Sequence, residues 1–144
     1  MEITIPLKFV NEEQEQFFNF SGRYSCLCGG FGNGKTHILC LKCLFLLTTF
    51  PKYRVAFIRR IFKELRRTTM TTFFAICPEE LYAEPFGRRS DTDGYCRFIN
   101  GSEIFFIGLD QIEKCLRGGI LWYKPDFQII PIIMDRLILQ KTQP

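Results

Sequence analysis

Runs of apolar residues alternate with polar turns along the first part of the chain and predict alternating strands and helices. Residues 23–28 form a short, largely apolar run that is typical of a buried strand. Residues 36–48 are apolar almost throughout, with Lys42 the exception, which indicates a well-buried helix that ends before Pro51. Residues 54–58 predict a second strand. This order of elements makes a βαβ unit, whose two strands run parallel.

Beyond the second strand the pattern predicts a helix, a loop and a hairpin. Residues 61–74 have the spacing of a helix with a basic face, and residues 88–94 form a polar loop region. Residues 95–99 and 102–107 predict the two strands of a hairpin. Asn100 and Gly101 between them supply the two positive φ angles that a type I′ turn requires. Together these elements indicate an α/β fold.

Composition places the chain among ordinary globular proteins. It has 144 residues, enough for one domain or part of one, of which 47% are hydrophobic and 24% charged. The formal net charge of +4 permits a polyanionic partner without requiring one. The seven cysteines lie within apolar segments and no secretory signal opens the chain, which favours reduced thiols in a cytosolic protein. The apolar stretches are too short and interrupted to span a bilayer, so no membrane is expected.

A glycine-rich loop follows the first strand and fits the complete G-x-x-x-x-G-K-[ST] pattern. Glycines let the backbone curl with its N–H groups turned inward around phosphate oxygens, and the next helix adds the positive end of its dipole. Lys35 would reach the β- and γ-phosphates and stabilise their charge, and the Thr36 hydroxyl would coordinate Mg²⁺. We therefore predict binding of ATP with Mg²⁺. The nucleotide-binding residues of this loop are Gly29, Gly30, Gly32, Asn33, Gly34, Lys35 and Thr36.

Hydrolysis of ATP requires further acidic residues, and the sequence contains no clear candidates for them. P-loop ATPases usually have a second strand that ends in an acid, often followed by a Glu that polarises the attacking water. After the hairpin, only the apolar run 129–134 ends in an acid, Asp135. Pro131 interrupts this run and Arg136 stands where a Glu would be expected. The residues of catalysis are therefore unassigned, and Glu103 and Asp110 are not selected for that role.

Two further clusters have a functional and a structural interpretation. Basic residues gather after the second strand, and they either contact phosphates or form a solvated helix face. Arg59 is the strongest candidate, as a nucleotide sensor, because ligands bind α/β sheets at the carboxyl ends of their strands. The cluster is Arg59, Arg60, Lys63, Arg66 and Arg67. His37, Cys40 and Cys43 recur every third residue, but no fourth ligand is evident, so core packing is favoured over a metal.

Four segments in the right order resemble the N-terminal part of the large terminase subunit of tailed bacteriophages, over about residues 9–118. They are residues 11–18, the P-loop 29–36, residues 56–68 with their strand, Arg and helix, and the hairpin 100–118. The resemblance implies that Gln14 contacts the adenine. It also implies a P-loop NTPase fold of the RecA-like (ASCE) type, with a mainly parallel sheet flanked by helices and a β-hairpin.

The same resemblance implies a role in ATP-driven translocation of DNA into the capsid. The expected partners are double-stranded DNA, the phage portal and the small terminase subunit, in an oligomeric ring in the host cytoplasm. The chain departs from the family at Phe31, where many terminases place an Arg, and in the missing Asp-Glu after Gly118. The coupling motif and the nuclease domain are also missing, so the fold is expected to be incomplete.

Residues 1–118 are therefore interpreted as the N-terminal part of a terminase-like ATPase domain, and residues 119–144 as an unrecognised tail. A frameshift is one hypothesis for that tail. We expect nucleotide binding with little or no turnover. Two alternatives stay open at this point: a non-catalytic interaction fragment, and another small P-loop NTPase.

Overall fold

The structure, a computed structural model, describes residues 4–21, 24–28, 32, 34–111, 127–133 and 136–140. Five helical segments and two strands precede the hairpin region: α1 (Glu12–Asn19), β1 (Tyr24–Cys28), α2 (Lys35–Thr49), β2 (Arg54–Arg59), α3 (Phe62–Leu65), η1 (Arg66–Met70) and α4 (Thr71–Ile76). The remaining elements are η2 (Glu79–Tyr82), β3 (Arg88–Ser90), β4 (Tyr95–Arg97), β5 (Glu103–Gly108), η3 (Leu109–Gln111), β6 (Phe127–Ile133) and β7 (Arg136–Gln140).

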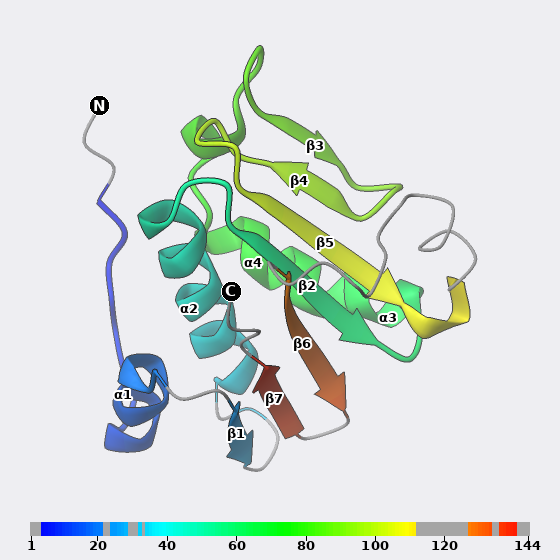
Figure 1. Ribbon diagram of the computed structural model, residues 1–144. Coiled ribbons are helices and arrows are strands. Elements are labelled where there is room, and N and C mark those ends of the chain that lie inside the picture. Colours follow the sequence, from blue (N-terminus) through cyan, green and yellow to red (C-terminus); the bar gives the residue numbers. More distant parts are fainter. Residues whose placement is uncertain are drawn as a thin grey trace.

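The strands form one seven-stranded sheet in the order β1-β7-β6-β2-β5-β4-β3 (Figure 1). Strand β2 pairs in parallel with β5 and with β6. The other four pairings are antiparallel. The predicted α/β class is therefore confirmed, but the sheet is mixed and not mainly parallel. Short connections join β3 to β4, β4 to β5 and β6 to β7, and short connections can only join antiparallel neighbours.

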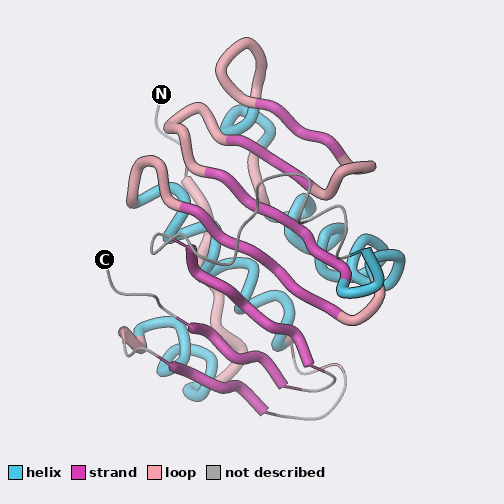
Figure 2. Tube along the Cα trace, turned by 45° about the vertical axis from the view of Figure 1, so that its right-hand side comes forward, coloured by secondary structure: helices cyan, strands magenta, loops and turns pink. Residues whose placement is uncertain are grey.

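Strands β1 and β2 run in the same direction without touching. Two antiparallel steps lead from β1 through β7 to β6, and a parallel step leads from β6 to β2. The parallel strands of the predicted βαβ unit are therefore confirmed, with two strands placed between them (Figure 2). The carboxyl ends of β1, β6, β2 and β5 consequently lie along one edge of the sheet.

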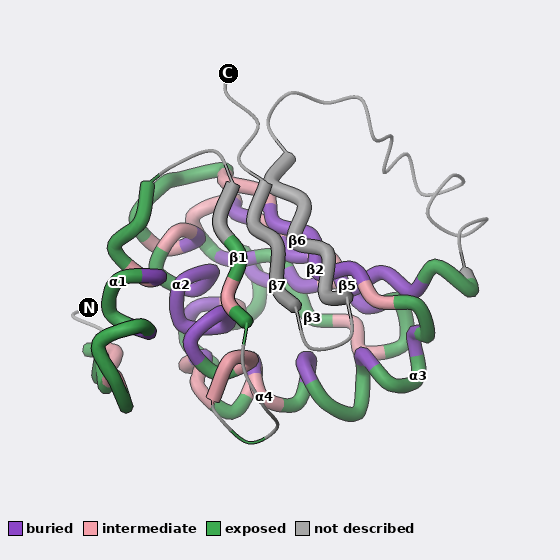
Figure 3. The backbone as a smooth tube through the Cα atoms, turned by 90° about the horizontal axis from the view of Figure 1, so that it is seen from below, coloured by how far each residue is buried: buried purple, intermediate pink, exposed green. Residues whose placement is uncertain are grey.

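Helices α1, α2, α3 and α4 lie on one side of the sheet, where most buried side chains gather (Figure 3). Side chains alternate across a strand. Val55 and Phe57 of β2 therefore face the helices, with Phe106 of β5 beside them, whereas Ala56 and Ile58 belong to a smaller buried cluster on the other face. Strand β2 is thus apolar on both faces, as its continuous apolar run predicts.

Helix α2 is the buried helix that the sequence predicts. Eight of its residues are buried, from Ile38 to Leu44 without interruption and again at Leu47. A helix that is apolar on nearly all sides is buried on nearly all sides. It packs against α1 and α4 as well as on the sheet.

The predicted helix 61–74 is present but contains a wider turn. Residues Arg66–Met70 form a π-helical segment between α3 and α4. The Thr71 hydroxyl donates a 3.1 Å hydrogen bond to the Arg66 carbonyl inside this segment. Single π-helical turns inside α-helices occur frequently at functional sites. The hydrophobic pattern contains no signal for such a turn, because one extra residue shifts the apolar positions only slightly.

The hairpin is confirmed, but the predicted type I′ turn is wrong. Strands β4 and β5 pair antiparallel, and Phe98 N–H continues the ladder with a 2.8 Å bond to the Ser102 carbonyl. Three residues therefore form the loop, and only Gly101 has a positive φ, of 83°. Asn100 keeps a negative φ and uses its side chain elsewhere: its amide donates to Leu47 O at 2.7 Å and its carbonyl oxygen accepts from Ser102 N at 2.9 Å.

Strand β6 includes Pro131, the residue that argued against a strand at this place. Pro131 lies opposite Ile58 of β2. On the other side, pairs with β7 are formed at Ile129, Ile132 and Ile133 but not at the two residues between Ile129 and Ile132. A proline has no N–H to donate, so the sheet tolerates it here at a gap in one ladder. The residues next to this strand, Met134 and Asp135, lie outside the described residues. Within the described part of the chain, no helix has the length and apolarity that crossing a bilayer requires.

We predict that Ser102→Ala lowers the free energy of unfolding by about 1–3 kcal/mol, because it leaves buried backbone groups without partners. The fully buried Ser102 hydroxyl donates to Phe50 O at 3.0 Å and accepts from Tyr53 N at 3.1 Å. Urea denaturation checks this value. The exposed Ser21→Ala is the matched control, with an expected change of less than about 0.5 kcal/mol. Equal losses in both variants would contradict the prediction.

Candidate functional site

The loop between β1 and α2 has the backbone that the glycine pattern predicts, as far as it is described. Gly32 and Gly34 have φ angles of 76° and 70°, in the left-handed region that favours glycine. Gly34 is the N-cap of α2, and its carbonyl accepts the first helical hydrogen bond from Ile38 N at 3.0 Å. The other predicted loop residues, Gly29, Gly30 and Asn33, lie outside the described residues.

The first turn of α2 presents a suitable charge for an anion. Lys35 and Thr36 begin the helix and are half-buried, and His37 is exposed. The N-cap residue Gly34 has no side chain to cap the helix, and the first turn of α2 contains no acidic residue. The N–H groups at the start of a helix and the helix dipole together favour a bound anion at this end. Binding of Mg²⁺ by Thr36 stays a prediction.

Gln14 lies directly beside this loop. It is buried, with 3% of its surface exposed, although it is polar. Its side-chain oxygen accepts a 3.0 Å bond from Val10 N, and a Cβ added to Gly34 would lie 3.0 Å from its amide nitrogen. Asn11 caps α1 by accepting a 2.9 Å bond from Gln14 N. The structure thus brings together Gln14 and Gly34, two residues that the sequence assigned to one site. Contact of Gln14 with adenine stays a prediction.

Lys42 holds α1 against α2 and was not assigned a role from the sequence. It is buried, and its ammonium group donates to Phe17 O and to Phe20 O, both at 2.7 Å. It also lies 4.9 Å from the centre of the Phe17 ring. These carbonyls end α1, so the lysine satisfies backbone groups that the helix itself leaves open. Its signal in the sequence is that it is the exception within the otherwise apolar run 36–48.

Arg59 stands at the carboxyl end of β2, as predicted, and is held by the helix that follows. Its guanidinium donates to the Thr68 hydroxyl at 2.9 Å and lies 3.5 Å from the Glu64 carboxylate. Two strands separate β2 from β1, so the two strand ends are roughly 14 Å apart at the usual strand spacing. A sensor role for Arg59 stays a prediction, and contact with a ligand at the loop requires release from Thr68.

The two acids that were set aside as catalytic candidates have structural partners. Asp110 accepts a 2.9 Å bond from Phe62 N and thereby caps α3 from outside the helix. Gly108 leaves the space for this contact, because an added Cβ would collide with Asp110 and Phe62. Glu103 binds Arg54 at 2.7 Å and accepts from the Tyr95 hydroxyl at 2.8 Å. Burial, followed by this bond to Glu103, raises the pKa of Tyr95 to about 12.

The cysteines fall into a buried and an exposed class. Cys40 and Cys43 are fully buried in the main core, while His37 on the same helix is exposed. Among the described residues, no three His, Cys, Asp or Glu side chains are placed to hold a metal. Burial raises the pKa of both thiols well above the usual value. Cys26 and Cys28 are exposed on β1, with their sulfur atoms 3.4 Å apart.

We predict that a thiol reagent labels Cys26 and Cys28 in the native chain and spares the four buried cysteines of the described part. Burial also raises the pKa of Cys77 and Cys96 to about 12, so these thiols stay protonated and unreactive at neutral pH. Iodoacetamide labelling followed by peptide mass mapping checks this. Unfolding in urea is the control and exposes all of them. Native labelling of Cys40 or Cys43 would show that the α2 core is open.

Comparison with known proteins adds no further restraint on this site. No protein-family model, no curated protein and no solved structure matches the chain. The support for a function therefore comes from the chain's own residues: the glycine conformations, the first turn of α2 without acidic residues and the position of Gln14.

Proposed function

We propose that the chain binds a nucleoside triphosphate, with ATP as the first choice, together with Mg²⁺ at the loop before α2. The observation that carries the proposal is Gly34, which combines a φ of 70° with the N-cap position of α2 and lies against Gln14. A left-handed glycine at this place turns the chain from strand into helix so that the first N–H groups of the helix face the loop. This is the arrangement that receives phosphate groups at helix N-termini.

Each residue of the loop has a defined task in this proposal. The backbone N–H groups and Lys35 neutralise the phosphate charge, and the Thr36 hydroxyl is a Mg²⁺ ligand. Gln14 contacts the adenine after its side chain turns away from Val10. The position of the loop also supports the proposal. Ligands bind α/β sheets beyond the carboxyl ends of their strands, and this loop follows the carboxyl end of β1.

The wider role we propose is that of the ATP-binding part of a phage DNA-packaging motor of the terminase large-subunit type. Support comes from the order of the four segments in the sequence and from the α/β fold with its loop before a buried helix. In that role the partners are double-stranded DNA, the portal and the small terminase subunit.

Mg²⁺-ATP is expected to raise the thermal and urea stability of the chain, because a ligand that binds only the folded state must stabilise it. The gain is about 2.7 kcal/mol when the free ligand is at one hundred times its Kd. Lys35→Ala is expected to remove most of it, since the variant loses the charge that neutralises the phosphates in this proposal. The measurement is urea denaturation with and without Mg²⁺-ATP.

Arg97→Ala is the control for that experiment. It removes one exposed positive charge from β4, which lies near the other end of the strand order from β1. This variant should keep the full gain in stability from Mg²⁺-ATP. A chain that gains no stability from Mg²⁺-ATP would contradict the proposal. In that case the chain would be an interaction module that does not bind nucleotide.

We also predict little or no steady-state ATP hydrolysis. Among the described residues near the carboxyl ends of β2 and β5, Glu64 contacts Arg59 and Asp110 caps α3, so neither carboxylate is placed to polarise a water. Phosphate release from Mg²⁺-ATP should therefore be the same for the parent chain and for Lys35→Ala. A rate that is measurable in the parent and vanishes in Lys35→Ala would show that the chain is an active ATPase.

A further inference from the structure

A basic pocket lies between the helix after β2 and the edge strand β3. It is a pocket of about 400 Å³. The helix supplies one wall, through α3, η1 and the start of α4, and β3 with the turn after it supplies the other. The residues that line it are Lys63, Arg66, Arg67, Met70, Thr71, Arg89 and Asp91.

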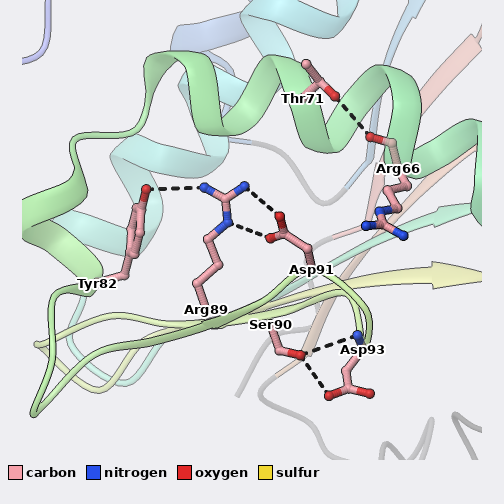
Figure 4. A network of polar contacts seen from close by, with 7 residues as sticks. All are labelled: Arg66, Thr71, Tyr82, Arg89, Ser90, Asp91 and Asp93. Carbon is pink, nitrogen blue, oxygen red and sulfur yellow. Dashed lines mark hydrogen bonds and ion pairs between the residues drawn. The ribbon is translucent and has the colours of Figure 1, made fainter.

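Four of these side chains are cations, and the single acid among them is already paired. Asp91 binds Arg89 through two bonds, Nε to Oδ1 at 2.5 Å and Nη2 to Oδ2 at 3.0 Å (Figure 4). The Arg89 guanidinium also lies 3.7 Å from the centre of the Phe74 ring and 3.4 Å from the Tyr82 hydroxyl. The Arg89–Asp91 pair is therefore fixed in place, and Asp91 does not neutralise the cations of the helix.

The three cations of the helix have no acidic partner within the described part of the chain. Lys63, Arg66 and Arg67 are exposed, and the two arginines lie three and four positions after Lys63, where side chains on a helix are neighbours. Glu64, the acid within the same turn, contacts Arg59 instead. Like charges at this spacing destabilise a helix, so the cluster has a cost that a bound anion would remove.

The backbone supports the same interpretation independently of the charges. The π-helical segment Arg66–Met70 coincides with the middle of the pocket wall. Thr71, which bonds to the Arg66 carbonyl across this wide turn, also lines the pocket. Figure 4 shows Arg66 extending from the helix toward the turn after β3. A π-helical turn is rare, and it widens the helix where the cations converge.

We propose that this pocket binds a small ligand that carries phosphate groups. Guanidinium groups match phosphate oxygens with two parallel hydrogen bonds, and Arg66 and Arg67 line one volume. Arg89 adds its charge to the opposite wall, while its donors bond to Asp91 and Tyr82. The four cations and one acid leave a net charge of +3, which suits a di- or triphosphate. The volume lies within the range of about 300–1,000 Å³ that small-molecule sites occupy. A pocket of this volume favours such a ligand over a nucleic-acid strand, which needs an extended groove.

This pocket is separate from the loop before α2. The loop follows β1, the first strand in the order of the sheet, and Arg89 belongs to β3, the last strand in that order. Six strand spacings, roughly 29 Å, separate β1 from β3, and three spacings, roughly 14 Å, separate β1 from β2, which the helix of the pocket follows. Binding at the two sites can therefore be tested separately with variants of each.

The test is isothermal titration of the full chain with inorganic pyrophosphate as the probe, without Mg²⁺. The variant Arg66→Gln/Arg67→Gln should weaken binding about tenfold or more, because each lost charged hydrogen bond is a large part of the affinity of a small anion. Arg97→Gln removes a charge from the neighbouring strand β4 outside the pocket and should bind like the parent. Lys35→Ala should also retain binding at the pocket.

Three results would overturn the proposal. Pyrophosphate binding that disappears in Lys35→Ala and persists in Arg66→Gln/Arg67→Gln would place the anion at the loop before α2 instead. Binding of equal strength in the parent and in the double variant, or no binding to the parent, would show a solvated helix face. A duplex oligonucleotide that binds through Arg66 and Arg67 and is not displaced by pyrophosphate would mark a nucleic-acid surface.

A second variant keeps the test decisive if the double variant does not fold. Lys63→Gln changes an exposed side chain of α3 and leaves the π-helical segment intact. It should weaken pyrophosphate binding about threefold to tenfold through the loss of one cation. Circular dichroism melting of every variant separates lost binding from lost folding, and unchanged binding in a folded Lys63→Gln would contradict the proposal.

Discussion

Burial of strand β2 is the constraint on which the rest of the structure depends. Its side chains are apolar on both faces, and it has a parallel neighbour on each side. Phe57 stacks on Phe106 of β5, with ring centres 5.4 Å apart, and meets the edge of Phe73 of α4 at 6.1 Å. Because both neighbours are parallel to β2, three strands end at one edge. Arg59 and Gly108 therefore lie in register at that edge, and the helix α3 begins there.

The region around the loop before α2 follows from a second buried contact. Lys42 binds the two carbonyls at the end of α1 and so fixes that helix on α2. The start of α1 then places Gln14 beside Gly34. A buried lysine is stable only when its charge has partners, and two carbonyls and the face of Phe17 provide them here. The core of the protein, and not a ligand, thus determines where Gln14 lies relative to the loop.

Local patterns predicted the elements well, and long-range pairing less well. Strands β1, β2 and β5 and helix α2 follow directly from apolar runs and their length. Strand β3 was taken for a loop because its residues Arg88–Ser90 are largely exposed and polar, as is common at a sheet edge. The turn type was missed because the Asn100 side chain binds Leu47 O, a residue far away in the sequence. The positions of β6 and β7 depend on pairings that periodicity does not encode.

The candidate sites divide in the same way. The loop before α2 was visible in the sequence, because its glycines and its Lys-Thr pair are adjacent and each type has a task. The sequence indicated only one wall of the basic pocket. Lys63, Arg66 and Arg67 form a recognisable basic run, but Arg89 lines the same pocket only because β3 folds against the helix. The helix that lines the pocket follows β2, three strand spacings or roughly 14 Å from β1, and β3 lies roughly 29 Å from β1; both distances exceed the Debye length of about 8 Å at physiological salt. Charge at one site therefore has little effect on the other, and any coupling between them must pass through the packed strands of the sheet.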